Sequence, residues 1–73
     1  MKIKWKQTFE ANIVDRFNEE TDNIEEDHNE IIKEGEVDEV DLEENGENHY
    51  NVQFGSGGVA FCIHKSAFEI IEG

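Results

Sequence analysis

The chain has 73 residues, of which 19 are Asp or Glu and 6 are Lys or Arg, and its formal net charge is −13. This length allows one small domain with a thin core. The sign of the charge excludes a protein that grips nucleic acid, or an anionic membrane, through basic side chains. No apolar run approaches the ~20 residues that span a bilayer, one Cys cannot form an internal disulfide, and no signal-peptide segment follows Met1. We therefore expect a cytoplasmic protein.

The negative charge is concentrated in the middle of the chain. Residues 15–47 contain 16 acidic residues against Arg16 and Lys33, a net charge of −14, whereas residues 1–14 carry +2 and residues 48–73 carry −1. Like charges at this density destabilise a compact state. We therefore expect counterions, the flanking strands or a basic partner to offset the repulsion.

The first residues alternate between apolar and polar side chains, which predicts a long half-buried strand. Gln7 interrupts the apolar face, so we expect a bend at this position. The apolar positions of the alternating pattern are Ile3, Trp5, Phe9, Ala11 and Ile13.

Residues 15–35 form an acidic insertion for which the sequence leaves three structures open. Four residues recur at helical spacing before Gly35, which favours a short helix. Neighbouring like charges oppose a helix and favour a long acidic loop, and low hydrophobicity with high charge favours disorder over residues 15–30. The residues with helical spacing are Ile24, His28, Ile31 and Ile32.

The C-terminal half predicts short strands joined by tight turns. Asn45-Gly46 is a strong signal for a two-residue type I′ turn between two strands, and GSGG at residues 55–58 predicts a second turn. Residues 65–68 predict a 3₁₀ turn, and residues 69–71 predict a last short strand. With the N-terminal strand this makes about five strands, the pattern of a small antiparallel barrel.

The core is expected to come from the larger apolar side chains of these strands. In residues 59–64, Val59, Phe61 and Ile63 alternate with smaller or polar residues, so we expect these three to face inwards. The full expected core is Trp5, Phe9, Ile13, Val40, Leu42, Val52, Phe54, Val59, Phe61, Ile63, Phe68 and Ile70.

Residues 31–71 resemble a small SH3-like barrel. Ile32 to Val37 resemble the turn that follows the RT loop of SH3 folds, and the acidic run before them resembles an elongated RT loop. In this resemblance Asn45-Gly46 is the n-Src-like turn, residues 55–58 are the distal turn, and residues 65–68 are the 3₁₀ turn before the closing strand. The pattern is also similar to short acidic proteins encoded by phages and prophages.

The resemblance implies a single SH3-like domain over residues 1–73, but not the recognition of proline motifs. Proline motifs dock in an aromatic-lined groove, whereas this chain has one Trp, one Tyr and no Pro. A fold does not by itself carry a function. The function therefore has to be inferred from particular residues.

No group of residues predicts an enzyme, a cofactor or a metal site. Asp41, Glu43, Asn45 and Gly46 match the start of an EF-hand loop, but Val52 stands where a bidentate Glu is required. The His and Cys residues lack zinc-like spacing. The GSGG turn matches neither a nucleophile elbow nor a phosphate-binding loop.

The strongest functional candidate is the acidic surface itself. Duplex DNA carries one negative charge per ~1.7 Å of helix axis, and a folded domain with −14 on 33 residues can approach that density. A protein that grips phosphates with Lys and Arg would accept such a surface as a decoy, with bidentate Arg pairs as the strongest contacts. The residues expected to contact the partner are Glu19, Glu20, Asp22, Glu25, Glu26, Asp27 and Glu30.

These observations predict a non-enzymatic interaction protein of phage type, whose acidic face occupies a basic, nucleic-acid-binding surface on a host or phage protein. One alternative is a structural or assembly module whose acidity only provides solubility. A third reading is an acid-rich enzyme or cation buffer.

Overall fold

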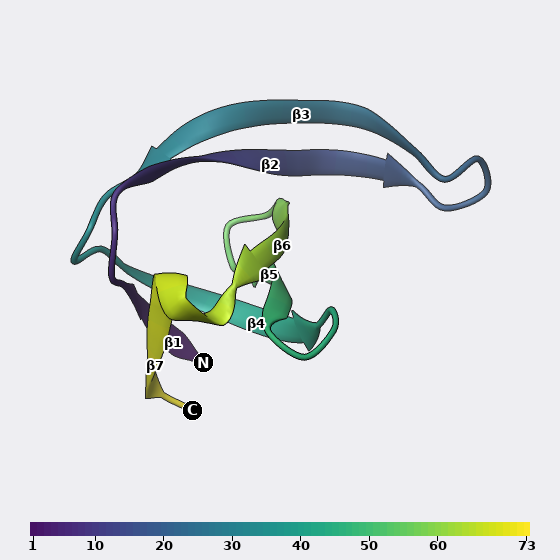
Figure 1. Ribbon diagram of the computed structural model, residues 1–73. Helices are drawn as coiled ribbons and strands as arrows, with labels where there is room; N and C mark the ends of the chain where they lie inside the picture. Colours follow the sequence, from purple (N-terminus) through teal and green to yellow (C-terminus); the bar gives the residue numbers. More distant parts are fainter.

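All 73 residues are described by the computed structural model, and their strands pair in a single antiparallel sheet (Figure 1). The strand order is β3-β2-β6-β5-β4-β1-β7. The prediction of a mainly β protein is confirmed, but the expected number of about five strands is wrong, since the sheet has seven. The elements are β1 (Lys2–Trp5), β2 (Phe9–Asn18), β3 (Asn23–Ile32), β4 (Val37–Glu44), β5 (His49–Phe54), β6 (Val59–His64), the 3₁₀ helix η1 (Lys65–Ala67) and β7 (Phe68–Glu72).

One of the two additional strands arises because the predicted N-terminal strand divides into β1 and β2, and the other is β3. Strands β2 and β3 form a long hairpin, which arches over the other strands (Figure 1). Its pairing runs from Phe9 opposite Ile32 to Asn18 opposite Asn23. A ten-residue strand spans roughly 33 Å, and the longest dimension of the molecule is 35 Å. The expected acidic loop or short helix over residues 15–35 is therefore wrong, because the backbone of this segment continues the pairing that begins in the half-buried part of β2.

The expected bend at Gln7 is confirmed. β1 ends at Trp5 and pairs with β4 and β7, whereas β2 begins at Phe9 and pairs with β3 and β6. The alternating pattern thus serves two strands with different neighbours. Gln7 therefore separates β1, which pairs with the C-terminal strand β7, from β2, which forms the hairpin with β3.

The two expected tight turns are present, although one differs in length. The Asn45 backbone N–H donates to the His49 carbonyl at 2.9 Å, which closes a three-residue loop rather than a two-residue type I′ turn. Within this loop only Gly46 has a positive φ, of 89°. In the second turn the Phe54 N–H donates to the Gly58 carbonyl at 3.0 Å. The 3₁₀ helix and the last strand also form as expected.

A β-bulge in β6 reverses part of the expected core. The register shifts opposite Asn51, and Cys62 adopts a φ of 56°. An extra residue in one strand interrupts the alternation of its faces. As a result Ala60 is buried and Phe61 is 42% exposed, so the prediction that Phe61 lies in the core is wrong.

Ile70 was also expected in the core and is 54% exposed. It lies on β7, an edge strand of the sheet, which has a neighbouring strand on one side only. Trp5 is fully buried at the centre of the core, and its ring lies 5.6 Å from Phe9 and 5.7 Å from Phe68 between centroids. Ile3 and Ala11 lie on the predicted apolar face of the N-terminal strand. The buried residues outside the list of expected core residues are Ile3, Ala11, Val14, Ile32, Ala60 and Ala67.

Candidate functional site

The residues expected to contact a partner all lie on the β2–β3 hairpin, and all are exposed. Three stand in the turn that joins the strands, and four stand in β3. The structure therefore gathers the full set on one projecting element. The turn residues are Glu19, Glu20 and Asp22, and the β3 residues are Glu25, Glu26, Asp27 and Glu30.

Strand β2 supplies the hydrogen-bond donors that hold the carboxylates of β3. Asn12 Nδ2 donates to Asp27 Oδ2 at 2.9 Å, and Asn18 Nδ2 donates to Glu25 Oε1 at 2.9 Å. The Arg16 guanidinium lies 2.9 Å from a Glu26 carboxylate oxygen. These contacts offset the repulsion between neighbouring carboxylates, so β3 can carry many charges and still pair with β2.

The turn at the end of the hairpin is fixed by Asn18. Its Oδ1 accepts hydrogen bonds from the backbone N–H groups of Glu20 at 2.9 Å and Thr21 at 3.3 Å. Asx side chains that accept from the backbone two residues later stabilise turns. Asp22 completes the reversal with a φ of 60°, a conformation that Asp tolerates better than most residues.

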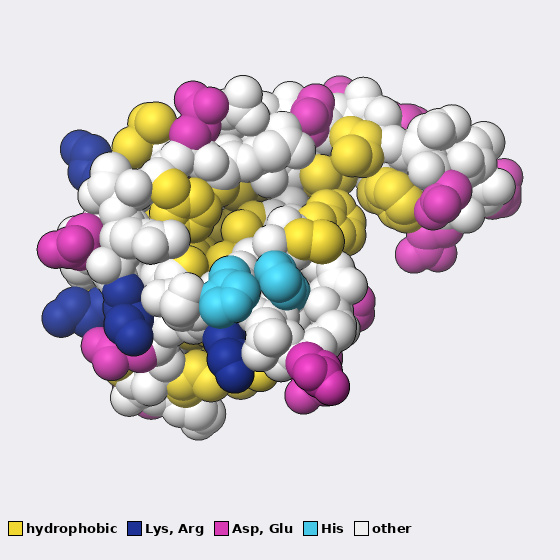
Figure 2. Space-filling model, viewed as in Figure 1, with side chains coloured by type: hydrophobic (Ala, Val, Ile, Leu, Met, Phe, Trp, Pro, Cys, Tyr) yellow, Lys and Arg dark blue, Asp and Glu magenta, His cyan; other side chains and the backbone are white.

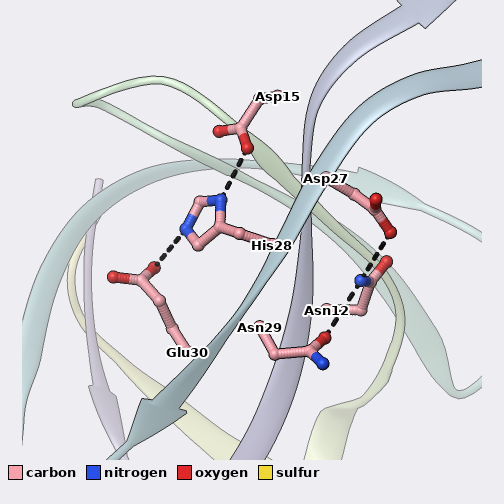
Figure 3. Close-up of polar contacts among 6 residues, drawn as sticks. All are labelled: Asn12, Asp15, Asp27, His28, Asn29 and Glu30. Carbon is pink, nitrogen blue, oxygen red and sulfur yellow. Dashed lines mark hydrogen bonds and ion pairs between the residues drawn. The ribbon is translucent and has the colours of Figure 1, made fainter.

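The side chains of β3 form two separate polar groups (Figure 3). On one side His28 lies between Asp15 and Glu30, with its Nδ1 2.5 Å from Asp15 Oδ2 and its Nε2 3.4 Å from Glu30 Oε2. On the other side Asn12 Nδ2 bonds to Asp27 and also donates to Asn29 Oδ1 at 3.1 Å. Alternation along a strand explains this division, because successive side chains point to opposite faces.

The position of His28 between two carboxylates raises its pKa above the ordinary value of 6.5. The largest cause is the hydrogen bond with Asp15, and the contact with Glu30 acts in the same direction, while partial desolvation opposes both. An imidazolium at this place neutralises part of the local negative charge. The hairpin therefore has a titratable contact in its middle.

A pocket of about 300 Å³ lies between the hairpin and the start of β4. Asp15 and Glu30 line it from the hairpin, and Glu36 and Asp38 line it from the opposite wall. Its acidic walls thus come from both halves of residues 15–47. No group of three or more His, Cys, Asp or Glu side chains in the structure is arranged to hold a metal ion.

Sequence reasoning selected the exposed acids but missed the residues that hold them. Asn12 and Asn18 occupy polar positions of β2, and Asp15 and His28 meet across the hairpin. Their polar character was visible, but their partners depend on the register between β2 and β3, which no local pattern specifies.

The one helical segment, η1, has three residues, and the structure contains no helix long and apolar enough to pass through a membrane.

Comparisons with family models, with curated proteins and with solved structures give no match for this chain. A function must therefore be inferred from the residues of the chain itself.

Proposed function

We propose that this chain is a non-enzymatic protein-interaction module, similar to a phage-encoded nucleic-acid mimic, whose β2–β3 hairpin occupies a basic, nucleic-acid-binding surface on a partner protein. The observation that carries the proposal is the grouping of seven exposed carboxylates on one projecting hairpin. We expect this chain to bind its partner in the cytoplasm. For a phage-encoded protein, this is the cytoplasm of the host.

The spacing of the charges supports this proposal. Residues 15–32 contain eight acidic residues and, besides His28, one basic residue, Arg16. Spread over a hairpin of roughly 33 Å, eight carboxylates give about one per 4 Å. One strand of a DNA duplex carries one phosphate per ~3.4 Å. Counted over its two faces together, the hairpin thus approaches the charge density of a single nucleic-acid strand.

The availability of the carboxylates also supports the proposal. Glu19, Glu20 and Asp22 take part in none of the ion pairs of the molecule. The projecting end of the hairpin shows acidic and hydrophobic side chains and no Lys or Arg in the view of Figure 2. Carboxylates without internal partners can accept bidentate hydrogen bonds from Arg, which are among the stronger polar contacts.

We also infer that the sheet is an SH3-like barrel in which the β2–β3 hairpin corresponds to an extended RT loop. β7 follows a 3₁₀ turn and pairs with β1, β1 in turn pairs with β4, and β4, β5 and β6 form a meander. Backbone contacts measured by nuclear magnetic resonance between β1 and β7, and between β2 and β6, would support this assignment. Their absence would contradict it.

The function is tested by capturing partners from a bacterial lysate on the immobilised protein and eluting them with a salt gradient. The wild type should retain a basic nucleic-acid-binding protein that elutes as the salt concentration rises, since salt screens exposed charges. The variant E25K/E26K/D27K should lose it. The control E43K/E44K/E47K undergoes the same change in formal charge outside the hairpin and should keep it.

Glu25 and Glu26 contact Arg16, so charge reversal there also disturbs the hairpin. The variant E19Q/E20Q/D22N avoids this difficulty, because it neutralises only side chains without ion pairs, and Asn also tolerates a positive φ. We expect this variant to elute at lower salt than the wild type. If both hairpin variants retain the partner as firmly as the wild type does, the proposed function is wrong.

A structural or assembly module is the second candidate, and the free edge of β7 favours it. β7 ends the sheet, and Ile70 and Ile71 on it are 54% and 48% exposed. An exposed edge strand can pair with the same strand of another copy. In this case sedimentation should show self-association that persists or strengthens at high salt, and the exchange I70K/I71K should abolish it.

A further inference from the structure

Three exposed hydrophobic side chains meet at the far end of the hairpin. Phe17 of β2 is 39% exposed and lies opposite Ile24 of β3, which is 50% exposed. The ring of Phe17 also lies 6.2 Å between centroids from the ring of Phe61, which is 42% exposed and belongs to β6. We call these three residues the apolar patch. Grouped exposed hydrophobic side chains mark interaction sites more often than scattered ones do.

Acidic residues flank the apolar patch in the sequence. Glu19, Glu20 and Asp22 lie in the turn that follows β2, and Glu25 is adjacent to Ile24. The only Lys or Arg of the hairpin strands and their turn, Arg16, is already engaged by Glu25 at 3.8 Å and by Glu26 at 2.9 Å. Figure 2 shows hydrophobic side chains beside acidic ones where the far end of the hairpin leaves the body of the molecule.

The charge of these flanking residues decides what kind of molecule covers the patch. A second copy of the chain would bring flanking residues of the same sign against them, in a protein with a net charge of −13. Such like-charge contacts are unfavourable. A complementary partner presents an apolar or aromatic side chain surrounded by Lys and Arg.

Proteins that bind single-stranded nucleic acid present this combination, since they join a basic groove along the backbone with aromatic side chains on which bases stack. A surface that contacts the phosphates of a duplex does not need aromatic side chains, because the bases are already stacked inside the duplex. The charge spacing of the hairpin, counted over both faces, is close to that of one nucleic-acid strand and agrees with the same partner.

We propose that the apolar patch receives a base-stacking aromatic side chain of the partner, so that the hairpin imitates a single strand of nucleic acid, with carboxylates in place of phosphates and Phe17 and Phe61 in place of bases. This inference rests on the proposed function and specifies its partner as a single-strand-binding protein. The patch adds a contact that salt does not screen.

The inference is tested with two dye-labelled peptides of equal charge, one with six Lys and two Trp and one with six Lys and two Ser, by fluorescence anisotropy at low salt. We expect the Trp peptide to bind the wild type about tenfold more tightly than the Ser peptide does, a typical effect of one stacking contact. The variant F17S/F61S should remove this advantage and leave the Ser peptide unaffected. The control I71S removes a similarly exposed side chain on β7 and should change neither peptide.

The outcomes separate this inference from the function on which it rests. Equal affinity of both peptides for the wild type, with binding that salt weakens, would overturn the apolar patch as a stacking site and leave the acidic decoy intact. No binding of either peptide at low salt would overturn both. Both side chains are exposed, so we expect F17S/F61S to keep the fold of the wild type. An unchanged far-ultraviolet circular dichroism spectrum of the variant checks this expectation.

Discussion

The indole Nε1 of Trp5 donates a hydrogen bond to Asp38 Oδ2 at 2.7 Å, which joins β1 to β4 across 33 positions of sequence. Trp5 is fully buried, so its N–H has no access to water. Asp38 points to the same side of β4 as buried Val40, because alternate residues of a strand share a face. One of the 19 acidic residues thus accepts a hydrogen bond from a core side chain and also lines the pocket beside the hairpin.

Replacing Asp38 by Ala should destabilise the protein by about 1–3 kcal/mol, because it leaves the buried indole N–H without an acceptor. Asp38→Asn keeps an acceptor oxygen and should cost less. Urea unfolding followed by Trp5 fluorescence measures both values. Asp41→Ala, an exposed acid of the same strand, is the control and should change the free energy of unfolding by less than about 0.5 kcal/mol.

Gly58 is required in the second turn for two reasons that can be separated. Its φ is 91°, and a Cβ at this position would lie 2.5 Å from Ile13 Cγ2. Gly57 has a φ of 107° but nothing within 4 Å of such a Cβ. We expect Gly58→Ala to lower the free energy of unfolding by about 1–3 kcal/mol more than Gly57→Ala does, which is the usual cost of overpacking. Equal losses in urea titrations would show that the contact with Ile13 is unimportant.

The raised pKa of His28 predicts how the hairpin responds to pH. A proton bound more tightly in the folded state stabilises that state fully below the unfolded value of 6.5, and the stabilisation is lost as the pH rises through the folded pKa. The ring-proton titration of His28 by nuclear magnetic resonance should therefore have a midpoint above 6.5. Asp15→Asn should lower this midpoint, since the bond with Asp15 is its largest cause. A midpoint at or below 6.5 would mean that His28 does not contact the carboxylates in solution.

Asn18 should control the order of the hairpin turn without affecting the core. Asn18→Ala removes the acceptor for the Glu20 and Thr21 N–H groups and also the donor to Glu25, whereas Glu25→Ala leaves the acceptor in place. We expect amide exchange in the turn to become faster in Asn18→Ala and to change less in Glu25→Ala. The exchange of Val52, which is fully buried in β5, should stay as it is. Faster exchange throughout the protein would show that the hairpin is not an independent element.

The local features of the fold were largely predictable from sequence. The bend at Gln7, the hairpin at Asn45-Gly46, the turn at residues 55–58 and the 3₁₀ turn depend on alternation and on turn chemistry, which act over a few residues. β3 was not predictable in this way, because its side chains are exposed on both faces except at Ile32, and no hydrophobic alternation marks it. The pairing with β2 supplies the stability that its own pattern lacks.

The exposed acids of the candidate site were predictable from charge, but their support and the apolar patch were not. Phe61 faces outwards only because the bulge at Cys62 interrupts the alternation of β6, and Phe17 meets it from a different strand. Bulges depend on the pairing of two strands rather than on one. Contacts of this kind become visible only when the register is known.

The central claim is that the hairpin occupies the nucleic-acid site of its partner, and competition tests it most directly. The captured partner is loaded with a fluorescent single-stranded oligonucleotide, and the protein is added in increasing amounts. We predict that the wild type and E43K/E44K/E47K displace the oligonucleotide, whereas E19Q/E20Q/D22N needs a higher concentration to do so. A partner that binds the protein and the oligonucleotide at the same time, in a ternary complex, would contradict the account.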